Sequence, residues 1–314
     1  MINFGICFSK EFVGDNPLRH IGSKLPVYLR LLELCQKEGW DIYVLTRKTY
    51  KGNGIFEGSW LFKEEKFIPV KEEVKIDLIY DRTGGIYFPP ANEPDLKVFN
   101  NHKFKVLCWD KSMAYKEIGE YMPKTFWVGD KKGLNKILPE IKTEWIVLKP
   151  FNGLKGNGIF IGPKEQARSF EFIGKDPKYI AQEFLDTSRG ITGITKGLHD
   201  LRVAIVNGKV VWCHIRVPVE GTFTSNAAQG GNLTEVDYSL VPESIKNIVN
   251  KIIPEFANKY DNPSYSLDFG IGRDSVPKIF EINDQIGFPK WEMKARDTFL
   301  KELVESFKKK IHDK

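Results

Sequence analysis

Residues 266–289 read SLDFGIGRDSVPKIFEINDQIGFP and predict a β-hairpin that carries polar side chains inside apolar strands. Asp268 lies on the first strand, and Glu281 and Asn283 lie two residues apart on the second, so these last two side chains point to one face of the sheet. Two carboxylates and an amide oxygen on one face suit a hard cation such as Mg²⁺, which leaves its other positions to water and substrate phosphates. The alternative is a plain hairpin whose polar side chains face solvent.

The composition is that of an ordinary globular protein of 314 residues with a formal net charge of +6. Part of this charge lies in the terminal run FKKKIHDK, which is typical of a solvated helix end and not of a nucleic-acid-binding patch. The four cysteines are scattered without metal-ligand spacing, and we expect reduced thiols in a cytoplasmic protein. We see no signal peptide and no apolar run of membrane-spanning length, so neither a membrane nor a nucleic acid is an expected partner.

Residues 1–105 are predicted to form a small α/β domain. Apolar strands at 2–9, 41–46 and 76–81 alternate with a helix at about 23–37, whose apolar residues recur at helical spacing. The order strand, helix, strand predicts a small parallel sheet.

Two further regions follow, at 106–185 and 186–314. The second contains two apolar runs joined by Asn207-Gly208, a dipeptide that is the strongest short-range signal of a β-hairpin. A helix is expected at about 242–260, then the hairpin quoted above and a C-terminal helix.

A glycine-rich segment between two predicted strands is a candidate for binding phosphates. Lys149 ends the strand WIVLKP, and the loop after it contains Gly153, Gly156 and Gly158. Glycine lets backbone N–H groups approach phosphate oxygens closely. The loop returns to a strand, which excludes the Rossmann fingerprint and the P-loop because both require a helix at this point. A glycine-rich flap over nucleotide phosphates and a plain hairpin loop both remain open.

The strand KYIAQEFLD offers a candidate edge for a nucleotide base. Where its main chain emerges, at residues 183–185, backbone acceptors and donors can reach an adenine edge, and Asp186 can reach ribose hydroxyls. The alternative is a strand that simply leaves the core.

Arginines on the next predicted hairpin provide cations. Asp200 and Arg202 share one face of a strand, and Arg216 lies on the paired strand. Two guanidinium groups beside a metal can bind carboxylate or phosphate and stabilise negative charge. An ion pair within the sheet between Asp200 and an arginine is an equally compatible reading. Asn226, in TSNAAQGG, can add an amide contact beside the metal.

In order, the chain reads DK at 110–111, KP followed by spaced glycines, QEF, DLR, IR, SN…GG, LD and EIN. This series over about 106–290 resembles the ATP-grasp superfamily, and within it the carboxylate–amine ligases: glutathione synthetase, D-alanine–D-alanine ligase and the glutamate ligases that extend a ribosomal protein. The resemblance implies an α/β (α+β) fold in which two α+β subdomains form the ATP-grasp unit, at 106–185 (lid) and 186–314 (metal and catalytic), after a small parallel α/β domain.

The resemblance also implies a role for each candidate residue. Three residues match the magnesium ligands, with Glu281 bridging two ions: Asp268, Glu281 and Asn283. Arg202 and Arg216 would hold the acyl phosphate and the carboxylate from which it forms, and Asn226 is grouped with them as a catalytic residue. The residues implied to bind the nucleotide are Lys111, Lys149, Gly153, Gly156, Gly158, Gln182, Glu183, Phe184, Leu185 and Asp186.

The implied activity is an ATP-dependent ligation of a small-molecule carboxylate to an amine, an amino acid or peptide, with ADP and phosphate as products. The cofactors would be ATP and two Mg²⁺ ions, with Mn²⁺ as a substitute, in a possible homo-oligomer. Transfer to a hydroxyl or thiol, phosphoryl transfer, and a non-catalytic ATP-binding module remain alternatives.

Two features depart from the resemblance or lie outside it. Thr224 and Gln229 stand where the ribosomal-protein ligases carry arginines, which weakens the case for an acidic substrate such as glutamate. The segment YDRTGG at 80–85 is not explained by nucleotide chemistry, and it either lines the site of the acyl substrate or packs.

Overall fold

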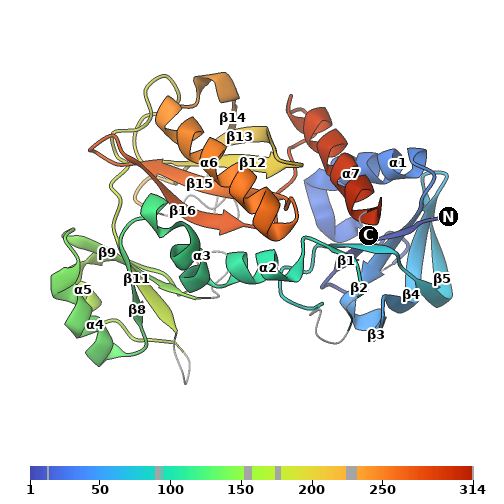
Figure 1. The fold of residues 1–314 in the computed structure, drawn as a ribbon, viewed down its shortest axis with the longest axis horizontal. Helices are drawn as coiled ribbons and strands as arrows, with labels where there is room; N and C mark the ends of the chain where they lie inside the picture. The colour runs from blue at the N-terminus through green and yellow to red at the C-terminus, as the bar shows by residue number, and fades with distance from the viewer. Residues whose placement is uncertain are drawn as a thin grey trace.

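The computed structural model describes residues 1–12, 14–88, 93, 95–151, 158–173, 178–223 and 232–312. Three β-sheets with helices packed around them make up the described part of the chain (Figure 1). A seven-stranded sheet belongs to the N-terminal region, a four-stranded sheet to the middle region and a five-stranded sheet to the C-terminal region. The predicted fold class is confirmed.

The N-terminal sheet has a parallel centre, as predicted. β1 (Asn3–Phe8) pairs in parallel with β2 (Asp41–Thr46) and with β6 (Leu78–Asp81), and α1 (Leu25–Lys37) connects the first two strands. β7 (Val98–Phe99) extends the parallel part. The sequence analysis missed three antiparallel strands that widen this sheet: β3 (Tyr50–Gly52), β4 (Ile55–Lys63) and β5 (Lys66–Lys75). β5 is exposed or half-buried throughout, so it lacks the apolar alternation that reveals a strand.

The middle region is an antiparallel sheet with short helices, in the order β10-β9-β11-β8. Its strands are β8 (Thr125–Val128), β9 (Trp145–Pro150), β10 (Phe160–Pro163) and β11 (Tyr179–Glu183), and its helices are α4 (Lys131–Ile137) and α5 (Lys164–Ala167). We call this unit the lid sheet. Two helices precede it, α2 (His102–Trp109) and α3 (Lys111–Ile118).

The C-terminal sheet is antiparallel in the order β14-β13-β12-β15-β16. Both predicted hairpins are confirmed: β12 (Asp200–Val206) pairs with β13 (Lys209–Val217), and β15 (Tyr265–Ile271) pairs with β16 (Pro277–Asn283). β14 (Asn232–Val236) completes the sheet, and two long helices pack against it, α6 (Glu243–Tyr260) and α7 (Arg296–His312).

The two faces of the C-terminal sheet differ in chemistry, and this difference positions the site. One face is apolar and packs on α6 and α2, where the rings of Phe104 and Phe256 lie 5.7 Å apart between centroids. The other face carries one row of aligned side chains across all five strands: Glu235, His214, Arg202, Asp268 and Glu281. Farther along this second face, α7 packs on Trp212 and also on the N-terminal sheet, where Phe307 lies 4.8 Å from Phe4.

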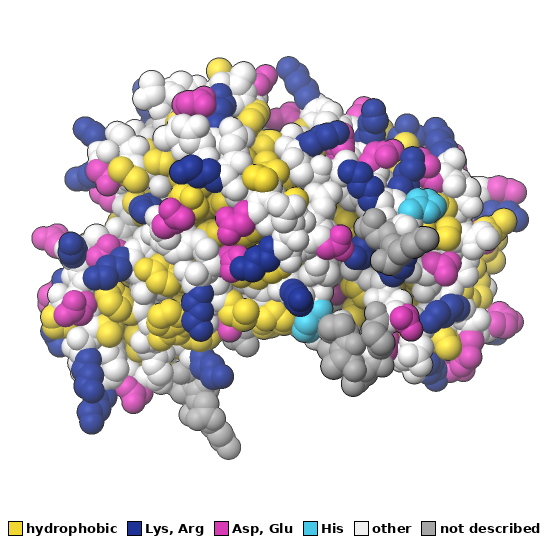
Figure 2. All heavy atoms as spheres, in the orientation of Figure 1, with side chains coloured by type: hydrophobic (Ala, Val, Ile, Leu, Met, Phe, Trp, Pro, Cys, Tyr) yellow, Lys and Arg dark blue, Asp and Glu magenta, His cyan; other side chains and the backbone are white. Residues whose placement is uncertain are grey.

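Three further features concern the surface charge, the character of the helices and the state of the cysteines. Cationic and anionic side chains are interspersed on the face seen in Figure 2. No helix within the described residues combines the length and apolar character that a membrane crossing requires. All four cysteines are buried and unpaired.

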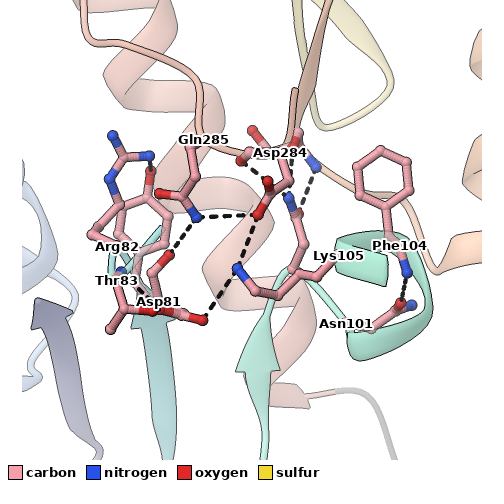
Figure 3. A network of polar contacts seen from close by, with 11 residues as sticks. Asp81, Arg82, Thr83, Asn101, Phe104, Lys105, Asp284 and Gln285 are labelled. Carbon is pink, nitrogen blue, oxygen red and sulfur yellow. Dashed lines mark hydrogen bonds and ion pairs between the residues drawn. The ribbon is translucent and has the colours of Figure 1, made fainter. Parts of the chain in front are cut away.

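A buried ionic network joins the N-terminal sheet to the end of β16 (Figure 3). The Lys105 ammonium lies 3.1 Å from the Asp81 carboxylate and 2.9 Å from that of Asp284. Gln285 Nε2 donates to the Asp81 carbonyl oxygen at 3.0 Å and to the Asp284 carboxylate at 3.1 Å. Burial alone would lower the pKa of Lys105, but the two carboxylates outweigh burial and raise it. The network therefore fixes the segment that follows Asn283 against the carboxyl end of β6.

Replacing Lys105 by methionine leaves two buried carboxylates without a cation. We expect the free energy of unfolding, measured by urea denaturation, to fall by about 3–5 kcal/mol. Lys103→Met, at an exposed position on the same helix, should change it by less than about 0.5 kcal/mol. The triple variant K105M/D81N/D284N, which removes the stranded charges, should regain part of the loss. Equal stability of K105M and K103M would contradict a structural role for the network.

Candidate active site

A pocket lies between the lid sheet and the polar face of the C-terminal sheet. It brings together nine of the predicted site residues: Lys111, Lys149, Gln182, Glu183, Phe184, Leu185, Arg216, Asp268 and Glu281. Arg202 and Asn283 do not line the pocket but bond to Asp268 at its border. Residues distant in sequence, from β9, α3 and β16, therefore meet at one place.

Asp268 is the centre of the charged row. It is 2% exposed, and both of its oxygens accept hydrogen bonds from Arg202, Nε to Oδ1 at 2.6 Å and Nη2 to Oδ2 at 2.6 Å. Arg216 Nη2 donates to the same Oδ2 at 2.8 Å and also to Asp200. Burial alone would raise the pKa of Asp268, but the two guanidinium groups lower it far below its usual range. The carboxylate is therefore held ionised in the sheet.

The predicted ion pair within the sheet also exists, between Asp200 and Arg216. Burial and the neighbouring Asp268 charge raise the pKa of Asp200. One oxygen of Asp200 and Arg216 Nε are buried without a hydrogen-bond partner in the described part of the chain. Because unsatisfied buried polar groups are costly, these two atoms are candidates for ligand contacts.

A β-bulge in the quoted hairpin places two adjacent side chains on the pocket. Asp268 pairs with Glu281 and Phe269 with Ile279, so Phe280 has no partner on β15. Phe280 and Glu281 both line the pocket. Gly270 leaves room for this arrangement, because a Cβ atom there would lie 2.4 Å from the Phe280 ring.

Two lysines enter the pocket from different elements. Asp110 caps α3 by accepting the Ser112 N–H at 2.8 Å, and Lys111, the first residue of that helix, lies 3.2 Å from the Glu281 carboxylate. Lys149, on β9, donates to Gln182 Oε1 at 3.0 Å. Burial, with a further effect from the Lys111 charge, lowers the pKa of Lys149 to about 8. An anionic ligand at this position would stabilise the charged lysine.

The rim of the pocket combines free backbone groups with apolar walls. The Phe184 N–H donates a hydrogen bond to Thr143 Oγ1 at 3.2 Å, whereas the Leu185 N–H has no hydrogen-bond partner among the described residues. The apolar walls come from strands of both sheets and from the segments beside them, and comprise Val147, Ile159, Ile161, Phe184, Leu198, Phe223 and Phe280. A flat aromatic base with polar edges suits such a slot.

Other predicted residues lie elsewhere or outside the described residues. Asp186 does not line this pocket, and it pairs with Arg273 at 2.7 Å. Gly158 lies at the end of the predicted flap with a positive φ of 73°. Gly153, Gly156 and Asn226 fall outside the described residues.

The predicted magnesium ligands lie together on adjacent strands of one face. Asn283 Nδ2 donates to Asp268 Oδ2 at 3.2 Å, so this oxygen already accepts three hydrogen bonds, while Oδ1 accepts one. The described residues contain no cluster of three or more His, Cys, Asp and Glu side chains able to hold a metal. Two carboxylates and an amide nevertheless match Mg²⁺, which relies on substrate oxygens and water for its remaining ligands.

The sequence analysis missed His199, Phe223 and Phe280 as pocket residues. His199 accepts the Ile271 N–H at 3.3 Å, and burial lowers its pKa. Phe280 lies beside the recognised EIN motif, but only a bulge turns it to the pocket. Phe223 packs on Trp145 and Phe184, with centroids 5.1 and 5.8 Å away. No local motif signals these contacts.

Residues 111–259 match the family model described as the prokaryotic glutathione synthetase ATP-grasp domain. A probable alpha-L-glutamate ligase of Aliivibrio fischeri (strain MJ11) is 26% identical over 241 residues, 70% of this chain and 72% of the relative. A glutathione synthetase of Prochlorococcus marinus subsp. pastoris is 24% identical over 253 residues, 74% of this chain and 80% of the relative.

Among solved structures, D-alanyl-alanine synthetase A from Vibrio cholerae covers 99% of both chains with a TM-score of 0.66 at 13% identity. The ATP-grasp ligase PsnB, solved with minimal precursor, Mg and ADP, covers 96% of both chains with a TM-score of 0.59 at 12% identity. These structures share the fold of this chain. The family model identifies residues 111–259 as an ATP-grasp domain of the glutathione synthetase type, and the curated relatives are similar to this chain over 70–74% of its length.

Proposed function

We propose that this ATP-grasp carboxylate–amine ligase works through an acyl phosphate and releases ADP and phosphate. The observation that carries the proposal is one pocket lined by Lys111, Lys149, Arg216 and the ionised Asp268, which Arg202 holds from the border of the pocket. Cations on one wall and carboxylates on the other suit a triphosphate whose charge is shared between side chains and divalent ions.

The nucleotide base belongs in the apolar end of the pocket. The free Leu185 N–H supports the predicted backbone contact to an adenine edge, while Phe184 and Phe280 provide flat surfaces. The triphosphate then extends toward Lys149 and Lys111. Asp186 is left with a weaker case as the ribose ligand, because its carboxylate pairs with Arg273 outside this pocket.

Asp268 Oδ1, Glu281 and Asn283 would hold Mg²⁺, and we propose that two ions bind here with the nucleotide. When bound, the ions neutralise phosphate charge and align the terminal phosphate with the substrate carboxylate. Asn283 is oriented for this role, because its amide nitrogen faces Asp268 and leaves its oxygen for a cation. Lys111, which now pairs with Glu281, would turn to the phosphates.

Arg216 is the residue best placed to contact the reacting group. It lines the pocket, and its buried Nε–H lacks a partner in the described part of the chain. This donor can bind an oxygen of the carboxylate before transfer and of the acyl phosphate afterwards. Arg202 instead donates two hydrogen bonds to Asp268 and fixes the orientation of that carboxylate. An amine then attacks the acyl carbon, and phosphate leaves with the electron pair of the broken C–O bond.

The proposal is tested by incubating the protein with ATP, Mg²⁺ and pooled amino acids and short peptides. We expect ADP, phosphate and a condensed product whose mass equals the two substrates minus water. AMP and pyrophosphate would instead indicate adenylation. Tight ATP binding without any product across a broad panel would favour a non-catalytic module, and an ester or thioester product would identify a different acceptor.

Glu281→Gln keeps the size of the side chain and removes its charge. Because the charge would hold divalent ions against the phosphates, we expect kcat to fall by about 10²- to 10³-fold and the Mg²⁺ requirement to rise. The control is Glu292→Gln, an exposed position near the same segment. Steady-state phosphate release measures both. Near-native kcat in E281Q would mean that the metal ligands are misassigned.

The affinity for ATP should depend on the charge of Lys149. Its pKa of about 8 in the free protein should rise when phosphates bind, so ATP binding should take up protons between about pH 8 and 9.5. The affinity for ATP should therefore be constant below about pH 8 and weaken as the pH rises above it. Calorimetry in buffers of different ionisation enthalpy measures the uptake.

Lys149→Arg is the matched variant, because arginine stays charged across this range. It should abolish most of the proton uptake while retaining ATP binding. Unchanged uptake in K149R would show that another group titrates.

A further inference from the structure

Three cations gather outside the nucleotide pocket, next to the segment that follows β16. Lys24 ends the 3-10 helix Arg19–Lys24, Arg82 follows β6 within the YDRTGG segment, and Lys290 follows β16. None of the three lines the nucleotide pocket. Arg202, on the charged row, lies close enough to join them, since its charge and those of Arg82 and Lys290 act on Lys24.

Arg82 is held in place without a carboxylate partner. Its Nη2 donates to the Ile286 carbonyl oxygen at 3.1 Å, and its guanidinium carbon lies 5.4 Å from the ring centroids of both Tyr80 and Phe288. Figure 3 shows Arg82 beside Asp81 and Gln285 of the ionic network. Arg82 forms no ion pair with any described residue. These contacts of the guanidinium are all with neutral groups, and Asp284, whose charge also acts on Arg82, is paired with Lys105.

Lys24 reaches the same place from the other side. Its Nζ would lie 3.4 Å from a Cβ atom at Gly287, so the side chain crosses to the segment after β16. One turn further along, Tyr28 stacks on Phe288 with centroids 4.3 Å apart. The Lys24 side chain has neither a hydrogen bond nor an ion pair to another described residue. Burial, followed by the charges of Arg82, Arg202 and Lys290, lowers the pKa of Lys24 to about 8.

The nearby carboxylates already form ion pairs with other residues. Asp268 is bound by Arg202 and Arg216, while Asp81 and Asp284 share Lys105. Positive charge is therefore in excess at this junction. Burying like charges without a counter-ion is unfavourable, and an anionic ligand removes the penalty.

Uncommitted polar atoms lie on the adjoining sheet face. His214 Nδ1 and Ser266 Oγ are buried without a hydrogen-bond partner within the described residues. His214 pairs in register with Arg202, and Ser266 precedes Asp268 by two residues on the same face. Burial and the two arginines lower the pKa of His214 far below its usual value, so the ring is neutral. A polar ligand thus finds further hydrogen-bonding groups here.

We infer that Lys24 and Arg82 form a subsite for a free carboxylate of a substrate, one that is not joined in the reaction. This inference rests on the proposed ligase function, and it assigns a role to the YDRTGG segment. It also supplies cations that positions 224 and 229 lack. The carboxylate belongs either to the amine substrate, as the α-carboxylate of an amino acid or peptide, or to the acyl substrate, as a second carboxylate.

The test uses a substrate pair found productive with the full-length protein, ATP and Mg²⁺. Each non-reacting carboxylate is replaced in turn by a carboxamide, and KM and kcat are measured for wild type, Lys24→Met, Lys24→Arg and the control Lys37→Met. Lys37 is exposed at the far end of α1, the helix that begins directly after Lys24. The substrate whose amide loses affinity identifies which partner carries the docked carboxylate.

We expect the amide to raise KM about 10- to 100-fold in wild type, the range for losing a hydrogen bond to a charged group. K24M should raise KM for the acid similarly, leave KM for the amide and for ATP nearly unchanged, and be rescued in part by K24R. K37M should match wild type. Equal KM values for acid and amide, an equal effect of K24M on both, or a productive pair without a spare carboxylate would overturn the subsite.

Failure of the ligase function gives a different result, namely no product from any pair. In that case thermal shifts of the protein with ADP and Mg²⁺ are compared for the twenty L-amino acids and their amides. Stabilisation by acids over amides that K24M abolishes and K37M retains supports the subsite. The absence of such a difference overturns it.

Discussion

The ionised Asp268 carboxylate, held by Arg202 and Arg216 inside a β-sheet, is the interaction on which the site depends. Isolated, such a charge would be costly to bury, and each arginine would be equally costly alone. Together they form a rigid polar centre that faces the lid sheet. The arrangement requires the register of three strands, β13, β12 and β15, because each strand supplies one member. The register of these strands therefore determines both the fold of the C-terminal sheet and the positions of the charged side chains at the pocket.

The contrast between the two faces of this sheet explains how the polar centre is tolerated. The opposite face is filled by α6 and α2, and it supplies the apolar burial that keeps the strands in register. On the polar face, α7 covers only the part around Trp212 and leaves the charged row beside the pocket and the domain junction. The Lys105 network then fixes the segment after Asn283, so that the proposed metal ligands and Arg82 are positioned by the same contacts.

Sequence patterns predicted the elements that carry strong local signals. The Asn207-Gly208 hairpin, the 266–289 hairpin and the three parallel strands β1, β2 and β6 were predicted, because turn chemistry and apolar runs are local properties. The short parallel strand β7 was not predicted. β5 was missed because its side chains are largely exposed. The bulge at Phe280 was also beyond reach, since it depends on pairing with a strand whose register is set elsewhere. The roles of the individual site residues and the boundaries at 105 and 185 stay predictions.

The partners of the site residues were least predictable. The pairing of Asp186 with Arg273, and the convergence of Lys24, Arg82 and Gly287, join segments far apart in the chain. The central claim is that a triphosphate and divalent ions occupy the space between Lys149 and the row through Asp268. A crystal structure with Mg²⁺ and a non-hydrolysable ATP analogue tests it most directly. The account predicts phosphates beside Lys149 and Mg²⁺ about 2.1 Å from oxygens of Asp268, Glu281 and Asn283. A nucleotide bound outside this pocket, or a metal that none of these oxygens contacts, would contradict it.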